Sequence, residues 1–92
     1  MTPTRHFEIH EVLIHLGFDD DEWLDRLRQE GLFEHDLIDA READELRVAA
    51  VMIAELGVNP AGVQVALHLR RRLMTLESKV TAIVERIRTE ED

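Results

Sequence analysis

Apolar residues recur at helical spacing in two short segments near the start of the chain. The first segment runs through Ile9, Val12, Leu13 and Leu16. The second has an apolar face of Trp23, Leu24 and Leu27. Gly17 and Gly31 follow these segments, and a glycine just past the last periodic residue commonly ends a helix. The pattern predicts two short helices, and the alternation over residues 7–9 predicts one short strand before them.

A third helix is predicted between Asp39 and Gly57. Asp39 is followed three residues later by Glu42, which is the spacing of a capping box. The expected buried face consists of Ala43, Leu46, Ala50, Ile53 and Ala54, with Val51 beside them. The preceding segment, residues 32–38, is apolar at both ends and polar at its tip. We interpret it as a compact connector, a much-shortened hairpin.

The clearest helix signal begins at Asn59-Pro60, because asparagine caps helices and proline suits their first turn. Apolar residues then alternate in steps of three and four, the 3.5-residue period of a coiled coil. They are Ala66, Leu69, Leu73, Leu76, Val80, Ile83 and Ile87. The alternative is a helix that breaks near Thr75 and folds back, but residues 74–78 do not resemble a turn.

Such a helix would be about 45 Å long at 1.5 Å per residue. A compact domain of 92 residues has a radius of gyration of only about 12 Å, so the helix must project from the rest of the chain. Its apolar stripe then needs a second surface, and another copy of the same helix is the simplest one. We therefore expect two regions, an acidic helical domain over residues 1–57 and a coiled-coil dimerisation helix over residues 58–92. The expected dimerisation residues are Leu69, Leu73, Leu76, Val80, Ile83 and Ile87.

Chain length and composition further limit the classes of protein and of functional site that this sequence can form. A chain of 92 residues buries only about 60 to 65% of its unfolded surface, so a partner chain would help to stabilise it. The absence of cysteine excludes disulfides, thiol catalysis and thiolate metal sites. With no apolar run long enough for a signal peptide or a membrane span, we expect a cytoplasmic protein.

The net charge of -9 is concentrated in the first half of the chain. Residues 1–45 contain fourteen acids and four bases, whereas residues 46–92 contain six acids and seven bases. Nucleic-acid affinity comes largely from phosphate contacts, so an acidic half-chain is poorly suited to a duplex. It suits a basic protein surface instead.

The order of these elements and several short motifs resemble the MerR winged helix-turn-helix. The motifs are Ile9-His10-Glu11-Val12, Leu16-Gly17-Phe18, Leu24-Asp25-Arg26-Leu27 and Glu30-Gly31-Leu32. The stretch from Ile53 to Val63 resembles the entry to the C-terminal dimerisation helix of that superfamily. The resemblance implies a mainly α fold, a MerR-like winged helix-turn-helix with a reduced wing and a long C-terminal helix.

Within that superfamily the chain is most similar to the chaperone-modulator family CbpM, over nearly its whole length. The most specific stretches are residues 7–32 and 56–76, which include Gly62-Val63-Gln64-Val65-Ala66-Leu67-His68-Leu69. The resemblance implies a cytoplasmic homodimer that binds the J-domain of a DnaJ-like (CbpA-type) cochaperone. It also implies inhibition of that cochaperone, both in stimulating Hsp70 and, for some partners, in binding DNA. The runner-up is a MerR-like DNA-binding transcriptional regulator.

The leading end of the second helix decides between these two functions. A MerR repressor needs arginine or lysine there to reach bases and phosphates. Here the position carries acids, and the bases Arg26 and Arg28 lie in the last turns. The proposed partner-binding residues are Asp19, Asp20, Asp21, Glu22 and Asp25. A helix cap with a solvated face explains one or two acids, but not five.

Other candidate residues favour structural roles. The five histidines show no recognised metal-ligand spacing, so we expect no metal and no cofactor. Arg70, Arg71 and Arg72 point around a helix, which favours a coiled-coil flank over a nucleic-acid patch. Trp23 is expected in the core, and if exposed it would be an anchor for a partner. No arrangement of nucleophile, base and orienting group is recognisable, so we predict that the protein is not an enzyme.

Overall fold

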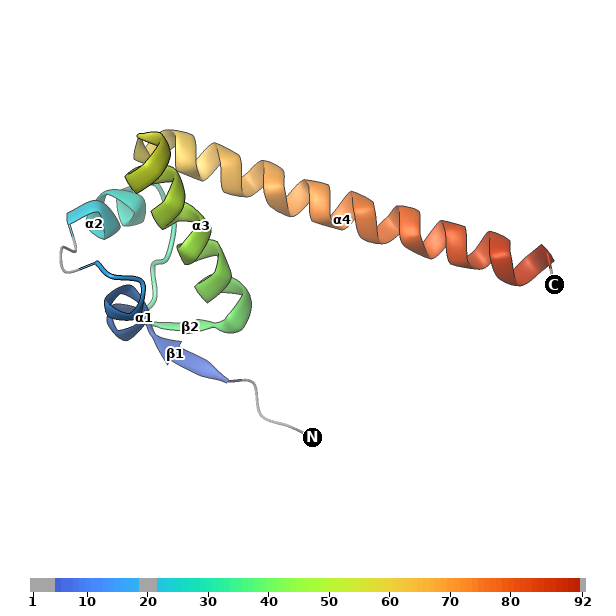
Figure 1. Ribbon diagram of the computed structural model, residues 1–92, viewed down its shortest axis with the longest axis horizontal. Coiled ribbons are helices and arrows are strands. Elements are labelled where there is room, and N and C mark those ends of the chain that lie inside the picture. Colours follow the sequence, from blue (N-terminus) through green and yellow to red (C-terminus); the bar gives the residue numbers. More distant parts are fainter. Residues whose placement is uncertain (1–4, 19–21, 92) are drawn as a thin grey trace.

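The computed structural model describes residues 5–18 and 22–91, and for these the prediction of a mainly helical fold is confirmed (Figure 1). The helices are α1 (Ile9–His15), α2 (Glu22–Gln29), α3 (Ala40–Leu56) and α4 (Pro60–Glu91). Two short strands complete the fold, β1 (His6–Glu8) and β2 (Leu37–Asp39). Among the described residues, no helix is both long and apolar enough to cross a membrane.

The ends of α3 follow the local signals in the sequence. The Asp39 carboxylate accepts a hydrogen bond from the Glu42 backbone N–H at 2.8 Å, and the Glu42 carboxylate accepts one from the Asp39 N–H at 3.3 Å. These two bonds confirm the predicted capping box. Gly57 ends the helix with φ of 65°, a left-handed conformation that costs glycine little because it has no Cβ. Asn59 then caps α4, since its Oδ1 accepts from the Gly62 N–H at 2.7 Å.

The two strands pair with each other in an antiparallel sheet, with Phe7 opposite Ile38. The strand predicted near residue 7 therefore exists, but residues 32–38 do not fold on themselves as the predicted hairpin. The final residues of that segment form β2 and take β1 as their partner. Figure 1 shows the resulting two-stranded ribbon beside α1. Pairing across 30 residues of sequence cannot be read from a local pattern, which explains the difference.

One hydrophobic core joins all of the helices. Its fully buried large apolar side chains are Ile9, Leu13, Leu24, Leu27, Ile38, Leu46, Val63 and Leu67. The predicted inner face of α3 is only partly correct, because Ala54 and Val51 are exposed while Ala49 is buried. Glu45 is also buried, although it was not expected to be. In the last turn of α3, Ala54 and Leu56 are exposed, whereas Ile53 is partly buried and packs against the core.

Helix α4 is continuous over 32 residues and leaves the core as a long arm (Figure 1). The radius of gyration is 16.7 Å, well above the value of about 12 Å expected for a compact chain of this length. The predicted projection is confirmed, and the alternative of a break near Thr75 is wrong. The first turns of α4 nevertheless close the core, since Val63 and Leu67 are almost completely buried. We call the elements β1 to α3 together with residues 60–71 the head.

A candidate protein-interaction surface

Helix α2 is fixed to the head by its apolar face. Leu24 and Leu27 are 1% and 0% exposed, so this face cannot rotate away from the core. Trp23 lies at the edge of the core, partly buried, with its ring edge-on to Phe18 at a centroid distance of 5.3 Å. The predicted structural role of Trp23 fits this position. Because the inner face is occupied, the polar face of α2 must point to solvent.

The exposed face of α2 carries two of the five predicted partner-binding acids. Glu22 and Asp25 are both exposed. Glu22 accepts a hydrogen bond from Arg26 at 3.0 Å, one helical turn away, in a solvent-exposed ion pair. The Asp25 side chain has no hydrogen bond or ion pair within the described ranges. The other three predicted residues, Asp19, Asp20 and Asp21, lie outside the described residues.

The second arginine of α2, Arg28, is held by contacts within the head. The Arg28 Nε donates to the Phe33 carbonyl at 2.8 Å, and its guanidinium also donates to the Asp36 carboxylate at 3.0 Å. Phe33 has φ of 52°, which is unfavourable for a residue with a side chain, so Arg28 holds a strained turn in place. Over residues 22–29, therefore, both arginines of α2 face carboxylates of the same chain. Arg28 is held by two partners in the head, whereas Arg26 is 61% exposed and its ion pair with Glu22 lies on the surface.

The predicted dimerisation residues form the second candidate surface, a row along α4. We call this row the α4 stripe: Leu69, Leu73, Leu76, Val80, Ile83 and Ile87. Each of these side chains is between 51% and 58% exposed, although each is large and apolar. Single exposed apolar residues are ordinary, but a contiguous row of this length marks an interaction surface. The stripe begins at Leu69, where α4 leaves the head, and continues along the arm, whereas the acids lie on a different helix, α2.

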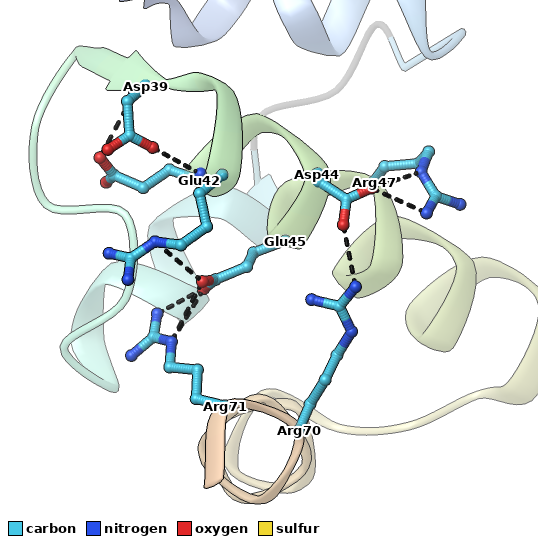
Figure 2. A network of polar contacts seen from close by, with 8 residues as sticks. Asp39, Glu42, Asp44, Glu45, Arg47, Arg70 and Arg71 are labelled. Carbon is cyan, nitrogen blue, oxygen red and sulfur yellow. Dashed lines mark hydrogen bonds and ion pairs between the residues drawn. The ribbon is translucent and has the colours of Figure 1, made fainter. Parts of the chain in front are cut away.

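A polar network joins α3 to α4 where the arm leaves the head (Figure 2). The carboxylate of Glu45 is 2% exposed, and the Arg71 guanidinium binds it through both Nε and a terminal nitrogen. Arg41 lies 3.8 Å from the same carboxylate, one turn earlier on α3. A buried carboxylate is strongly unfavourable unless it is paired, so Glu45 needs these arginines. The pairing fixes where α4 crosses α3.

Asp44 makes a second, more exposed connection in the same network (Figure 2). Its carboxylate accepts hydrogen bonds from Arg47 at 2.8 Å on its own helix and from Arg70 at 2.9 Å on α4. The two hydrogen bonds from Arg47, followed by the one from Arg70, hold the pKa of Asp44 below its ordinary value. The hydrogen bonds to Glu45 likewise raise the pKa of Arg71, which stays charged throughout the range in which proteins fold.

These contacts correct the sequence interpretation of the three consecutive arginines. Arg70 and Arg71 were expected on the flank of a coiled coil, but they bind carboxylates of α3 where α4 crosses that helix. Only Arg72 retains the predicted position, exposed beside the α4 stripe. One sequence signal could have revealed the network. Glu45 is next to Leu46 and one turn before Ala49, so it lies on the buried face of its helix. A charge at that phase needs an opposite charge on a neighbouring element.

The described part of the chain contains no cluster of three or more histidine or acidic side chains placed to hold a metal ion. Comparison with protein-family models, with curated proteins and with solved structures gave no match. The candidate surfaces of this protein are therefore defined by its own residues, above all by the exposed acids of α2 and by the α4 stripe.

Proposed function

We propose that this protein is a CbpM-like chaperone modulator that binds the J-domain of a DnaJ-like (CbpA-type) cochaperone through an acidic surface and inhibits its stimulation of Hsp70. The proposed binding residues are Asp19, Asp20, Asp21, Glu22 and Asp25, of which Glu22 and Asp25 lie on the exposed face of α2. In this proposal the protein acts as a homodimer in the cytoplasm and has no enzymatic activity. Its action depends only on binding.

The observation that carries the proposal is the charge on the outer face of α2. Glu22 and Asp25 are exposed there, and the two arginines of the helix face carboxylates of the same chain. Three further aspartates precede the helix in the sequence. A surface of this kind attracts a basic helix and repels a phosphate backbone.

Inhibition follows from competition for one surface. By the family resemblance, Hsp70 recognises a J-domain through a basic helix of that domain. An acidic protein that covers the same helix prevents Hsp70 from reaching it. Because the attraction is between exposed charges, salt should weaken it by screening, with a Debye length of about 8 Å at physiological ionic strength.

The test is titration of the full-length protein with an isolated DnaJ-type J-domain by calorimetry at 50 and 300 mM NaCl. We expect binding that weakens at the higher salt concentration. The triple variant Asp19→Asn, Asp20→Asn, Asp21→Asn should bind about tenfold more weakly at low salt and show a flatter salt dependence. Affinity equal to the wild type in this variant would rule out the electrostatic mechanism.

A matched pair of variants tests the described acids. Glu22→Gln with Asp25→Asn removes two negative charges from α2, and Glu55→Gln with Glu90→Gln removes two exposed charges elsewhere. Both variants change the net charge equally, so only a local surface effect can separate them. We expect weaker J-domain binding in the first variant alone. Equal losses in both would reduce the interaction to a general effect of net charge.

The DNA-binding alternative makes the opposite prediction in a gel shift at low salt. A MerR-like regulator should bind duplex DNA tightly there, whereas an acidic J-domain ligand should not. Tight binding to DNA without binding to a J-domain would replace the proposed function by the alternative.

A further inference from the structure

We propose that an open groove along the middle of α4 binds an acidic peptide segment of a partner protein. The groove has a volume of about 360 Å³. We call it the basic groove, and its lining residues are His68, Arg71, Arg72, Thr75, Leu76 and Lys79. It lies on a different helix from the acids of α2, so this inference does not depend on J-domain binding.

The charge of the basic groove is opposite to that of the whole chain. The sequence has twenty acids and eleven lysines and arginines, yet no acid lines the groove. Four of the six lining residues are basic, namely His68, Arg71, Arg72 and Lys79. Bases that gather in one hollow without an acid among them attract negative charge locally, even in a protein with a net charge of -9.

Two of these bases can bind a ligand without giving up a contact of their own. Arg72 and Lys79 are exposed, and neither has a hydrogen bond or ion pair within the described ranges. They are seven residues apart, almost two full turns of helix, so both side chains leave the same side of α4. An anion that bridges them does not have to displace a carboxylate of the protein.

Arg71 adds a cation whose position is fixed by the head. Its Nε and one terminal nitrogen bind the buried carboxylate of Glu45 (Figure 2). The other terminal nitrogen has no hydrogen bond within residues 5–18 and 22–91, and the side chain is 47% exposed. The ion pair with Glu45 therefore orients the guanidinium and leaves one nitrogen for a ligand. A donor that is already held in place loses less conformational entropy on binding.

A smaller hollow of about 160 Å³ adjoins the basic groove at Arg71 and Thr75. Its remaining lining residues are Arg41, Glu45, Arg70 and Met74. The carboxylate of Glu45 lies in its wall and disfavours a second negative group there. The basic groove has no such carboxylate, so we place the acidic segment in the basic groove.

The length of the basic groove suits a short extended peptide better than a small anion. His68 and Lys79 are eleven residues apart on α4, which is about 17 Å at 1.5 Å per residue. An extended segment covers that distance with about five residues at 3.3 Å each. Its carboxylates can meet several of the bases at once, and the planar guanidinium of an arginine matches a carboxylate well. A single small anion cannot span these bases.

A nucleic acid carries the same charge but fits the surroundings of the groove less well. Its affinity depends on the number of phosphates that are neutralised along the strand. Glu77 and Glu85 are exposed on the same helix, and residues 1–45 contain fourteen acids and only four bases. A long phosphate chain would come close to these acids, whereas a segment of about five residues ends within the groove.

The basic groove and the α4 stripe have only Leu76 in common. A second helix on the stripe would therefore border the groove rather than fill it. The bases of the groove lie beside the stripe and not on it. The proposal is thus compatible with a monomer and with the expected dimer.

The test is fluorescence anisotropy of labelled tri-, hexa- and nonaglutamate peptides with the 92-residue chain at 50 mM NaCl. Affinity should rise from the triglutamate to the hexaglutamate and then level off, because the groove holds about five residues. Inorganic phosphate at the same concentration as the unlabelled hexaglutamate should displace the labelled peptide far less. An affinity that keeps rising with peptide length, or equal displacement by phosphate, would overturn the proposal.

A matched pair of variants locates the binding. Arg72→Gln with Lys79→Gln removes two positive charges from the basic groove, and Arg5→Gln with Arg88→Gln removes two exposed charges elsewhere. Hexaglutamate should bind about tenfold more weakly to the first variant and equally well to the second. Equal losses in both would reduce the binding to an effect of net charge. A single-stranded oligonucleotide that binds more tightly than hexaglutamate would replace the acidic peptide by a nucleic acid.

Discussion

Single ionisable residues of this protein take their properties from neighbours that are distant in the sequence. Asp44 is an example, because one of its two arginine partners lies on α4, 26 residues later. Asp25 is also an acid on a helix surface, but it has no such partner in the described ranges. The two side chains have the same chemistry. They differ only in the residues that the fold places beside them.

Asp44 should give the stability of the head a dependence on acid pH. Its folded pKa lies below the ordinary value of 3.8 because of the hydrogen bonds from Arg47 and Arg70. A depressed pKa contributes stability above the unfolded pKa, and that contribution is lost as pH falls through the folded pKa. The Asp44 side chain is 44% exposed, so solvent screening limits the contribution to below about 1 kcal/mol.

The measurement is urea unfolding of the wild type and of Asp44→Asn at pH 7 and at pH 3. The variant should be less stable at pH 7, and the difference should shrink at pH 3, below the ordinary pKa of 3.8, because the unfolded chain binds a proton at Asp44 more readily than the folded chain does. Asp25→Asn serves as the control for the same chemical change without arginine partners. A difference that is equally large at both pH values would mean that the two hydrogen bonds do not stabilise the charged form.

At the scale of the elements, the crossing of α3 and α4 depends on one buried carboxylate. Glu45 is held by Arg71 across the two helices and by Arg41 from its own helix. Removal of Arg71 would leave a buried charge with only the more distant arginine. Breaking a buried pair from one side costs several kcal/mol, because the remaining charge is not compensated.

We therefore expect Arg71→Ala to lower the free energy of unfolding by about 2 kcal/mol and the melting temperature by about 10 °C. Arg88→Ala is the matched control, since Arg88 and Glu85 are mostly exposed and 3.8 Å apart, and it should change stability by less than about 0.5 kcal/mol. Replacing both partners, with Glu45→Leu and Arg71→Met, should recover most of the loss. If Arg71→Ala and Arg88→Ala have the same effect, the buried pair does not hold the crossing.

The elements themselves follow the sequence closely where the signals are local. The capping box at Asp39, the glycine end at Gly57 and the asparagine cap at Asn59 all lie where the sequence predicts them. Each depends on bonds within a few residues. The strand β2 and the buried position of Glu45 depend on partners 26 or more residues away, and the sequence interpretation missed both. Local patterns do not contain the information about which element becomes the neighbour.

At the scale of the whole molecule, the protein is a head with an arm whose apolar side is uncovered. The dimensions of 56 × 34 × 21 Å reflect that shape. If the α4 stripe is covered by a second copy, folding and association are coupled, and the melting temperature must depend on protein concentration. A monomer has no such dependence.

We expect the melting temperature of the wild type to rise over a hundredfold increase in protein concentration. Leu76→Asp places a charge in the centre of the α4 stripe and should give a lower melting temperature that does not change with concentration. Ser78→Asp is the control, because it adds the same charge to the same helix outside the stripe. A melting temperature of the wild type that is independent of concentration would show that the stripe is not a dimer interface under these conditions.

The sequence by itself determined the helices, their caps and the projecting arm, because these depend on the spacing of apolar residues and on contacts within one or two turns. It also located the negative charge in the first half of the chain and the stripe on the last helix. Only the tertiary structure decided that Arg28, Arg70 and Arg71 serve the head and that Glu45 is buried. Hydrogen bonds between distant elements depend on where the core brings helices together, and no periodicity along the chain records that position.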